Sequence, residues 1–127
     1  MKTIMIVDDQ MEVRELVAVT LQVGPYRTIK AKSGEEALTL AATEHPDLII
    51  MDVMMPGGID GYEATRRLRT EWETSACQIL LLTAKGQKED IEKGYEAGAN
   101  GYFIKPFSPL ELIQRVEEIL DPEQSNL

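Results

Sequence analysis

Short apolar runs alternate along this chain with longer stretches in which apolar residues recur at helical spacing. The strands predicted from these runs fall near 3–7, 27–31, 47–51, 78–82 and 102–104. An alternation of this kind is typical of a parallel β-sheet whose strands are joined by helices packed on its faces. We therefore predict an α/β, doubly wound fold with five strands and five helices.

The ends of the first two helical stretches are marked in the sequence. Gly24-Pro25 closes the first, and Ser33 with Glu36 predicts a capping box that opens the second. The only histidine, His45, stands before a proline at the exit of the second helix. We expect it to cap that helix or lie on the surface, and we assign it no chemistry.

The third and fourth helical stretches are weaker. The third follows Gly61, and its thin apolar face consists of Ala64, Leu68 and Trp72. The fourth, near 87–97, carries Gly94 in its interior, where glycine costs about 1 kcal/mol relative to alanine. We therefore expect the fourth helix to be the most mobile.

The length and composition fit one globular domain. The chain has 127 residues, of which 43% are hydrophobic and 28% charged, so disordered and fibrous classes are excluded. We place the domain at 1–121. The polar stretch 122–127 is interpreted as a C-terminal tail.

Charge and cysteine usage restrict the partners and the compartment. The formal net charge of −9 argues against direct binding to nucleic acid, which requires a basic surface. Cys77 is the only cysteine, so no intramolecular disulfide can form, and a reducing cytoplasmic location is predicted. The opening apolar run stops at Asp8, too early for a signal peptide or a membrane span.

Three acids and a lysine follow the ends of predicted strands: Asp8 and Asp9, Asp52, and Lys105. If the strands are parallel, these side chains meet at one edge of the sheet. Each like-charged pair of carboxylates would then cost roughly 4 kcal/mol at about 4 Å and an effective dielectric constant near 20. The cluster must therefore bind a cation or raise its pKa values, and a divalent ion with oxygen ligands is the natural solution.

With these residues, the chain resembles the receiver domain of two-component response regulators over essentially its whole length. The matching segments are Val7-Asp8-Asp9, 51–56, Leu82-Thr83-Ala84, Ala97-Gly98-Ala99 and Lys105-Pro106-Phe107. Each is weak by itself, but together, in order and at this spacing, they are very specific. The resemblance implies a flavodoxin-like (βα)5 sheet with strand order 2-1-3-4-5.

The resemblance also implies the chemistry of the site. Asp52 would accept a phosphoryl group from a sensor histidine kinase, a phosphotransfer protein or a small phosphodonor. Asp8, Asp9, one Asp52 oxygen and the backbone carbonyl of Met54 would hold Mg²⁺, and Lys105 would neutralise a phosphoryl oxygen. The chain would catalyse only its own phosphorylation and dephosphorylation, and is not otherwise an enzyme.

A conformational switch is implied as well. Thr83 would donate its hydroxyl to a phosphoryl oxygen, and Tyr102 matches an aromatic residue that turns inward when that threonine moves. The face formed by the fourth helix, fifth strand and fifth helix would then bind a downstream effector. The family usually has a cis peptide bond at the position of Lys105-Pro106.

Taken singly, each of these residues has an ordinary structural explanation. An Asp-Asp pair after a strand is typical of a helix N-cap beside a solvated neighbour. Thr83 by itself suggests a strand end, Lys105 a solvated lysine and Tyr102 a core residue. Asp52 is harder to explain in this way, because an acid that directly follows a buried strand needs a partner.

The chain departs from the family pattern at several positions. The loop 56–61 carries one extra residue and two adjacent glycines, so we expect it to be pliable. Met54 and Lys85 occupy positions that tune attack of water on the phosphoryl group, and we predict slow autodephosphorylation. Asn100-Gly101 replaces the paired acids common in receivers that dimerise, so a monomer or a weak dimer is predicted.

Three other functions compete with this interpretation. A phosphatase of the aspartate-nucleophile class typically has a second acid two residues after the nucleophile, where this chain has Met54. A receiver-like module that binds partners without phosphorylation usually lacks one of the key residues, and none is missing. A flavodoxin-like nucleotide binder would need a Gly-rich or Ser/Thr-rich loop after the first strand, and none follows it.

Overall fold

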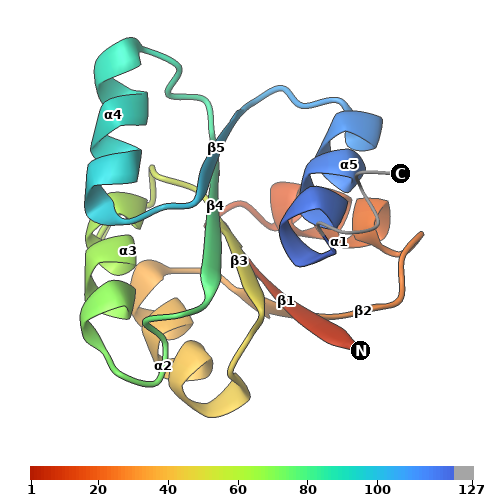
Figure 1. Cartoon of the computed structure of the whole chain (residues 1–127). Coiled ribbons are helices and arrows are strands. Elements are labelled where there is room, and N and C mark those ends of the chain that lie inside the picture. Colours follow the sequence, from red (N-terminus) through yellow and green to blue (C-terminus); the bar gives the residue numbers. More distant parts are fainter. Residues whose placement is uncertain (122–127) are drawn as a thin grey trace.

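Five strands alternate with five helices in the computed structural model, which describes residues 1–121 (Figure 1). The predicted tail at 122–127 lies outside the described residues. The elements are β1 (Lys2–Val7), α1 (Met11–Leu21), β2 (Tyr26–Ala31), α2 (Gly34–Glu44), β3 (Leu48–Met51), α3 (Gly61–Thr70), β4 (Gln78–Thr83), α4 (Lys88–Ala97), β5 (Gly101–Ile104) and α5 (Pro109–Leu120).

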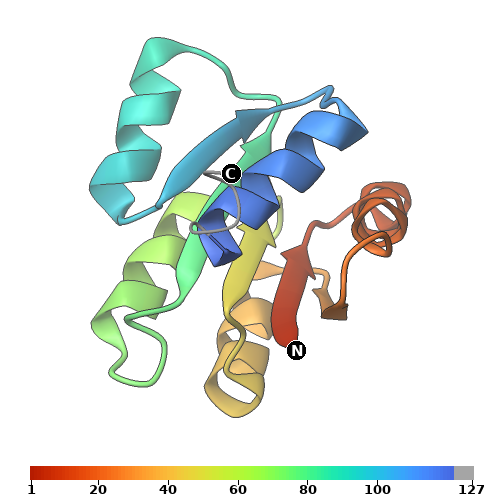
Figure 2. The ribbon, with the colours of Figure 1, turned by 45° about the vertical axis from the view of Figure 1, so that its right-hand side comes forward.

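The sheet is parallel throughout, with the order β2-β1-β3-β4-β5, which confirms the predicted topology. Helices α1 and α5 cover one face and α2, α3 and α4 cover the other (Figure 1). Figure 2 shows β1, β3 and β5 pointing the same way. Every residue that directly follows a strand therefore lies at the same edge of the sheet, and the chain order reverses between β1 and β3.

The core consists of two apolar layers, one on each face of the sheet. Alternate residues of β1 divide between the layers, Met5 and Val7 in one and Ile4 and Ile6 in the other. All of β3 is buried. A strand covered on both faces has no polar side, which explains why the central strands appear in the sequence as uninterrupted apolar runs.

The ends of α2 agree largely with the sequence. The Ser33 hydroxyl accepts a hydrogen bond from the Glu36 amide at 3.1 Å. The Glu36 carboxylate accepts from the amide of Lys32 at 3.3 Å, one residue before the partner that a capping box would use. His45 ends the helix at φ 48° and its amide donates to the Ala41 carbonyl, so the predicted capping role is confirmed.

The placement of Trp72 on the apolar face of the third helix is wrong. Helix α3 ends at Thr70, and Trp72 is 88% exposed. The Thr74 hydroxyl donates to the carbonyl of Leu68 at 2.7 Å, within the turn that connects α3 to β4. The buried aromatic of α3 is instead Tyr62, in its first turn.

Gly94 illustrates a helix position chosen by packing. A Cβ atom built there would lie 2.8 Å from the ring of Tyr102 and 3.1 Å from Leu81. Helix propensity predicts that Gly94→Ala stabilises the protein, whereas overpacking of this kind costs about 1–3 kcal/mol.

We expect Gly94→Ala to lower the free energy of unfolding by about 1 kcal/mol or more, measured by urea denaturation. The same substitution in a Tyr102→Leu background removes the ring that the new methyl group meets, and it should cost less. A gain in stability in the wild-type background would contradict the packing seen here.

Within residues 1–121, no helix is both long enough and apolar enough to cross a membrane. The predicted mobility of α4 stays a prediction.

Candidate functional site

Three carboxylates meet where β1 and β3 end. Asp8 and Asp9 follow β1 and Asp52 follows β3, its neighbour in the sheet. One oxygen from each of the three lies within 4.8 Å of the others. Asp8 is 3% exposed and Asp52 8%, whereas Asp9 is exposed. The structure thus brings together the acids that the sequence predicted to meet.

Lys105 contacts the same cluster from the edge strand β5. It follows β5, and its amide continues the pairing with β4 by donating to the Thr83 carbonyl at 2.8 Å. Its Nζ lies 2.9 Å from Oδ2 of Asp8 and 3.2 Å from Oδ2 of Asp52. The lysine therefore bridges the two buried carboxylates. The following peptide bond to Pro106 is cis, as predicted.

The environment shifts the pKa values of Asp8 and Lys105. Burial raises the pKa of Asp8, the Asp52 charge adds to this, and the Gln10 amide and Lys105 offset it only in part. Burial acts to lower the pKa of Lys105, but the two carboxylates outweigh it and the net shift is upward. Lys105 thus stays a cation. When all three acids are ionised, one ammonium group leaves the cluster short of positive charge.

Local hydrogen bonds fix the acids in place. Oδ1 of Asp8 accepts from the amide of Gln10 at 2.9 Å, and the backbone carbonyl of Asp8 accepts from Nη1 of Arg14 at 2.6 Å. Oδ1 of Asp52 accepts from the Met54 amide at 3.2 Å. Sequence reasoning did not single out Arg14. The one indication of its role was its position in the sequence, six residues after Asp8 and in the first turn of α1.

The residues present fit a hard divalent cation. The donors are carboxylate oxygens, two of them are largely buried, and their charge is incompletely balanced. Mg²⁺ prefers a few carboxylate ligands and keeps several waters, which suits a site open on the Asp9 side. Met54 stays a predicted ligand, because its described contact is made by the amide and not by the carbonyl.

Thr83 and Tyr102 contact the same residue. The buried Thr83 hydroxyl accepts from the amide of Lys85 at 3.3 Å, and the Tyr102 hydroxyl donates to the Lys85 carbonyl at 2.8 Å. Tyr102 is 8% exposed, so its ring lies inward in this structure. The loop after β4 is therefore held on one side by the threonine and on the other by the tyrosine.

The loop with the extra residue is tied to α2. Gly57 adopts φ 94°, a conformation that favours glycine. The amide of Ile59 donates to Oε2 of Glu35 at 2.9 Å, and this bond holds the pKa of Glu35 below its ordinary value. The carboxylate that receives this bond would also meet a Cβ at Gly58. The two glycines thus permit a defined path from Asp52 to α3.

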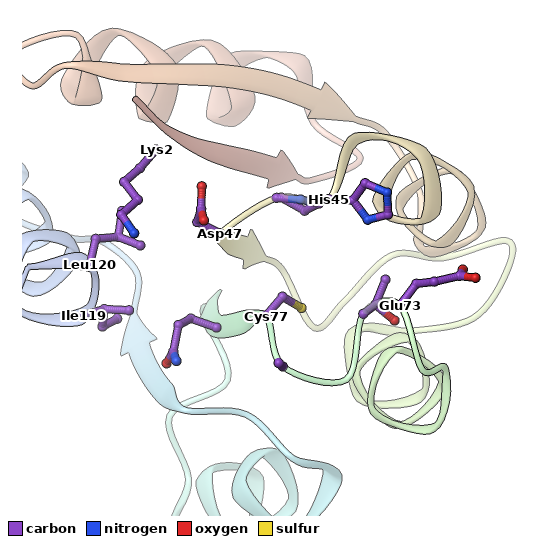
Figure 3. A pocket seen from close by; sticks show the side chains of 11 residues that line it. Lys2, His45, Asp47, Glu73, Cys77, Ile119 and Leu120 are labelled. Carbon is purple, nitrogen blue, oxygen red and sulfur yellow. The ribbon is translucent and has the colours of Figure 1, made fainter.

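A separate groove of about 390 Å³ lies at the opposite end of the strands (Figure 3). Its lining includes His45, Asp47 and Cys77, and none of the clustered acids. Burial raises the pKa of the Cys77 thiol, although Arg69 partly offsets this. Cys77 is half-buried, and its raised pKa disfavours the reactive thiolate form.

Comparison with known proteins places these features in a family. A family model for the response regulator receiver domain matches residues 4–117. The phosphate regulon transcriptional regulatory protein PhoB of Pseudomonas aeruginosa is 41% identical over 119 residues, which is 94% of this chain and 52% of that protein. The chain spans about half the length of the curated relatives it matches.

Solved structures agree with the sequence comparison. The chemotaxis protein CheY4 of Vibrio cholerae is 34% identical to this chain and superposes on it with a TM-score of 0.88. The match covers 94% of this chain and 99% of the CheY4 chain. The BeF3-activated receiver domain of DrrB, a protein of Thermotoga maritima, is 33% identical with a TM-score of 0.85, over 95% of this chain and 98% of its own.

Proposed function

Because the chain belongs to the response regulator receiver domain family, we propose that Asp52 accepts a phosphoryl group from a phosphohistidine or a small phosphodonor. The observation that carries the proposal is the contact of Lys105 with Asp8 and Asp52 inside a cluster of three carboxylates. In this arrangement an ammonium group lies beside the carboxylate proposed as the nucleophile, and further carboxylate oxygens are available for a metal.

In the proposed reaction, an Asp52 carboxylate oxygen attacks the phosphorus atom and forms an acyl phosphate. The bond from phosphorus to the donor breaks, and its electron pair leaves with the donor; in a phosphohistidine the leaving imidazole nitrogen takes up a proton. Lys105 neutralises a phosphoryl oxygen, and this contribution is positional and electrostatic. The protein is thus the substrate of its own chemistry, and no turnover of a separate substrate is proposed.

We propose Mg²⁺ as the cofactor, held by Asp8, Asp9, Asp52 and the Met54 carbonyl. When bound, it would supply positive charge to the transferring phosphoryl group. The carboxylates of Asp8 and Asp52 accept hydrogen bonds from the amides of Gln10 and Met54, two residues further along the chain in each case. The chain therefore keeps these donors oriented before any ion arrives.

The output is proposed to pass through the loop after β4. Thr83 would donate to the phosphoryl group, Tyr102 would stabilise the new loop position, and the face formed by α4, β5 and α5 would bind an effector. The upstream partner would be a sensor histidine kinase or a phosphotransfer protein. Slow autodephosphorylation, a monomer or weak dimer, a cytoplasmic location, the 1–121 domain boundary and the absence of direct nucleic-acid binding stay predictions.

The experiment that tests this function is phosphorylation by acetyl phosphate, followed by intact mass. We expect a single phosphoryl adduct that requires Mg²⁺ and is absent in Asp52→Asn. Asp60→Asn is the matched control: Asp60 caps α3 by accepting from the Glu63 amide at 2.9 Å, and asparagine keeps that cap. The control should be phosphorylated like the wild type.

The outcomes separate the candidate functions. An adduct in Asp52→Asn would place the phosphoryl group elsewhere and contradict the proposed role of Asp52. A folded wild-type protein without any adduct would favour the alternative, a receiver-like module that binds partners without phosphorylation.

A further inference from the structure

Two tyrosine hydroxyls meet in the interior between α3, α4 and β5. Tyr62, in the first turn of α3, is 3% exposed, and Tyr102, in β5, is 8% exposed. Their hydroxyl oxygens are 3.4 Å apart. The resemblance to receiver domains predicts a role for Tyr102, whereas no role was predicted for Tyr62.

The two hydroxyls have fewer protons than contacts. Tyr62 donates to the backbone carbonyl of Asp90 at 2.9 Å, and Tyr102 donates to that of Lys85 at 2.8 Å. Burial first, and then Tyr62, raise the pKa of Tyr102, so its phenol stays protonated. Since a phenol has one proton, no proton is left for the contact between the hydroxyls. The Tyr62 oxygen is thus an acceptor that Tyr102 can use only by releasing Lys85.

Both carbonyls belong to the segment that joins the site to α4. The amide of Lys85 donates to the Thr83 hydroxyl, and Asp90 lies in the first turn of α4. The Asp90 carboxylate accepts from the Gln87 amide at 3.2 Å and lies 3.8 Å from Nζ of Lys85. One tyrosine therefore holds the start of this segment, and the other holds its end.

Packing keeps α4 against both rings. Gly94 leaves room for the Tyr102 ring, since a Cβ there would lie 2.8 Å from it. Nζ of Lys93 lies 5.1 Å from the centre of the Tyr62 ring, within the range of a cation–π contact. Helix α4 thus contacts Tyr102 with one residue and Tyr62 with the one before it.

We propose that Tyr62 is a positioning residue that couples the Thr83 loop to α4. With the loop as seen here, Tyr62 holds Asp90 and Tyr102 holds Lys85. When Thr83 draws the Lys85 segment away, Tyr102 turns its proton to the Tyr62 oxygen, and the two tyrosines then hold α4 in its second position. This inference rests on the proposed function, because it takes movement of the loop from phosphorylation of Asp52.

The test compares Tyr62→Phe with Tyr95→Phe by amide hydrogen exchange. Tyr95 lies on α4 and is half exposed, so its hydroxyl makes a matched control. In the free protein we expect Tyr62→Phe to speed exchange of the α4 amides about fivefold, the effect of losing one buried hydrogen bond. Tyr95→Phe should leave exchange unchanged.

The second arm adds Mg²⁺ and beryllofluoride as a phosphoryl analogue. In wild-type protein, exchange in α4 should differ between the free and loaded forms. Tyr62→Phe should shrink that difference, and in a Tyr102→Phe background it should have a smaller effect, because the alternative bond is already lost. A tyrosine that only stabilises the fold would shift both forms equally and leave the difference intact.

The outcomes distinguish the two levels of the proposal. Beryllofluoride binding is followed independently by ¹⁹F NMR. If wild-type protein forms no complex, the proposed function fails and the coupling fails with it. If the complex forms and the difference in α4 is the same in Tyr62→Phe as in wild type, the coupling alone is overturned.

Discussion

Replacement of Lys105 by methionine is expected to slow phosphorylation of Asp52 by at least about 100-fold, the usual effect of removing one donor that stabilises developing charge. The same variant should bind Mg²⁺ more tightly than wild type. The reason is that Nζ of Lys105 lies beside Oδ2 of both Asp8 and Asp52, where it competes with any metal for the same carboxylates. Loss of activity together with tighter metal binding is the specific result expected.

The two effects are measured separately. The rate comes from a time course of the phosphoryl adduct at saturating Mg²⁺, and the affinity comes from isothermal titration calorimetry. Lys30→Met is the matched control, since the described ion pair of Lys30 is with Glu15 at 2.8 Å and not with the clustered acids. Weaker Mg²⁺ binding in Lys105→Met would mean that the lysine helps to organise the metal ligands and does not compete for them.

Gly61→Ala is expected to destabilise the protein more than Gly94→Ala does. A Cβ at Gly61 would overlap the backbone oxygen of Asp52 and would lie 2.8 Å from Cα of Val53. The Gly61 amide also donates to the Val53 carbonyl at 2.8 Å. Because the obstruction is backbone, no side chain can rotate to relieve it, and we expect a loss of about 3 kcal/mol or more in the free energy of unfolding.

Urea denaturation measures this effect, with Gly86→Ala as the control. A Cβ at Gly86 would meet only the side chain of Ile104, at 3.5 Å and beyond, so a change within about 0.5 kcal/mol is expected. The clash in Gly61→Ala would displace the backbone of Asp52, the proposed phosphoacceptor. The folded fraction should therefore be phosphorylated more slowly than Gly86→Ala, and equal rates would contradict this close packing.

Much of the fold could be predicted from the sequence because its signals are local. The apolar residues within 47–51 and 78–82 predict strands buried on both faces. Ser33 predicts a helix start because its hydroxyl accepts a hydrogen bond from the nearby amide of Glu36. Once the strands are parallel, the residues that follow them must share one edge. The meeting of Asp8, Asp52 and Lys105 followed from this geometry, whereas their roles came from the family resemblance.

What the sequence could not supply are contacts between segments distant in the chain. Helical spacing favoured Trp72 as a core residue, yet α3 ends before it, and the spacing does not show where the helix stops. Propensity treated Gly94 as a weakness of α4, whereas the ring of Tyr102 requires it. Neither outcome could be read from neighbouring residues, because each depends on which surface the helix meets.

The sequence by itself therefore determined the order and type of the elements, the parallel sheet, and the residues placed at its carboxyl edge. Tertiary structure alone decided that Lys105 bridges two carboxylates, that Arg14 holds the Asp8 carbonyl, and that Tyr62 meets Tyr102. The physical reason is range: strand and helix patterns repeat every few residues, whereas these contacts depend on how whole elements approach one another in space.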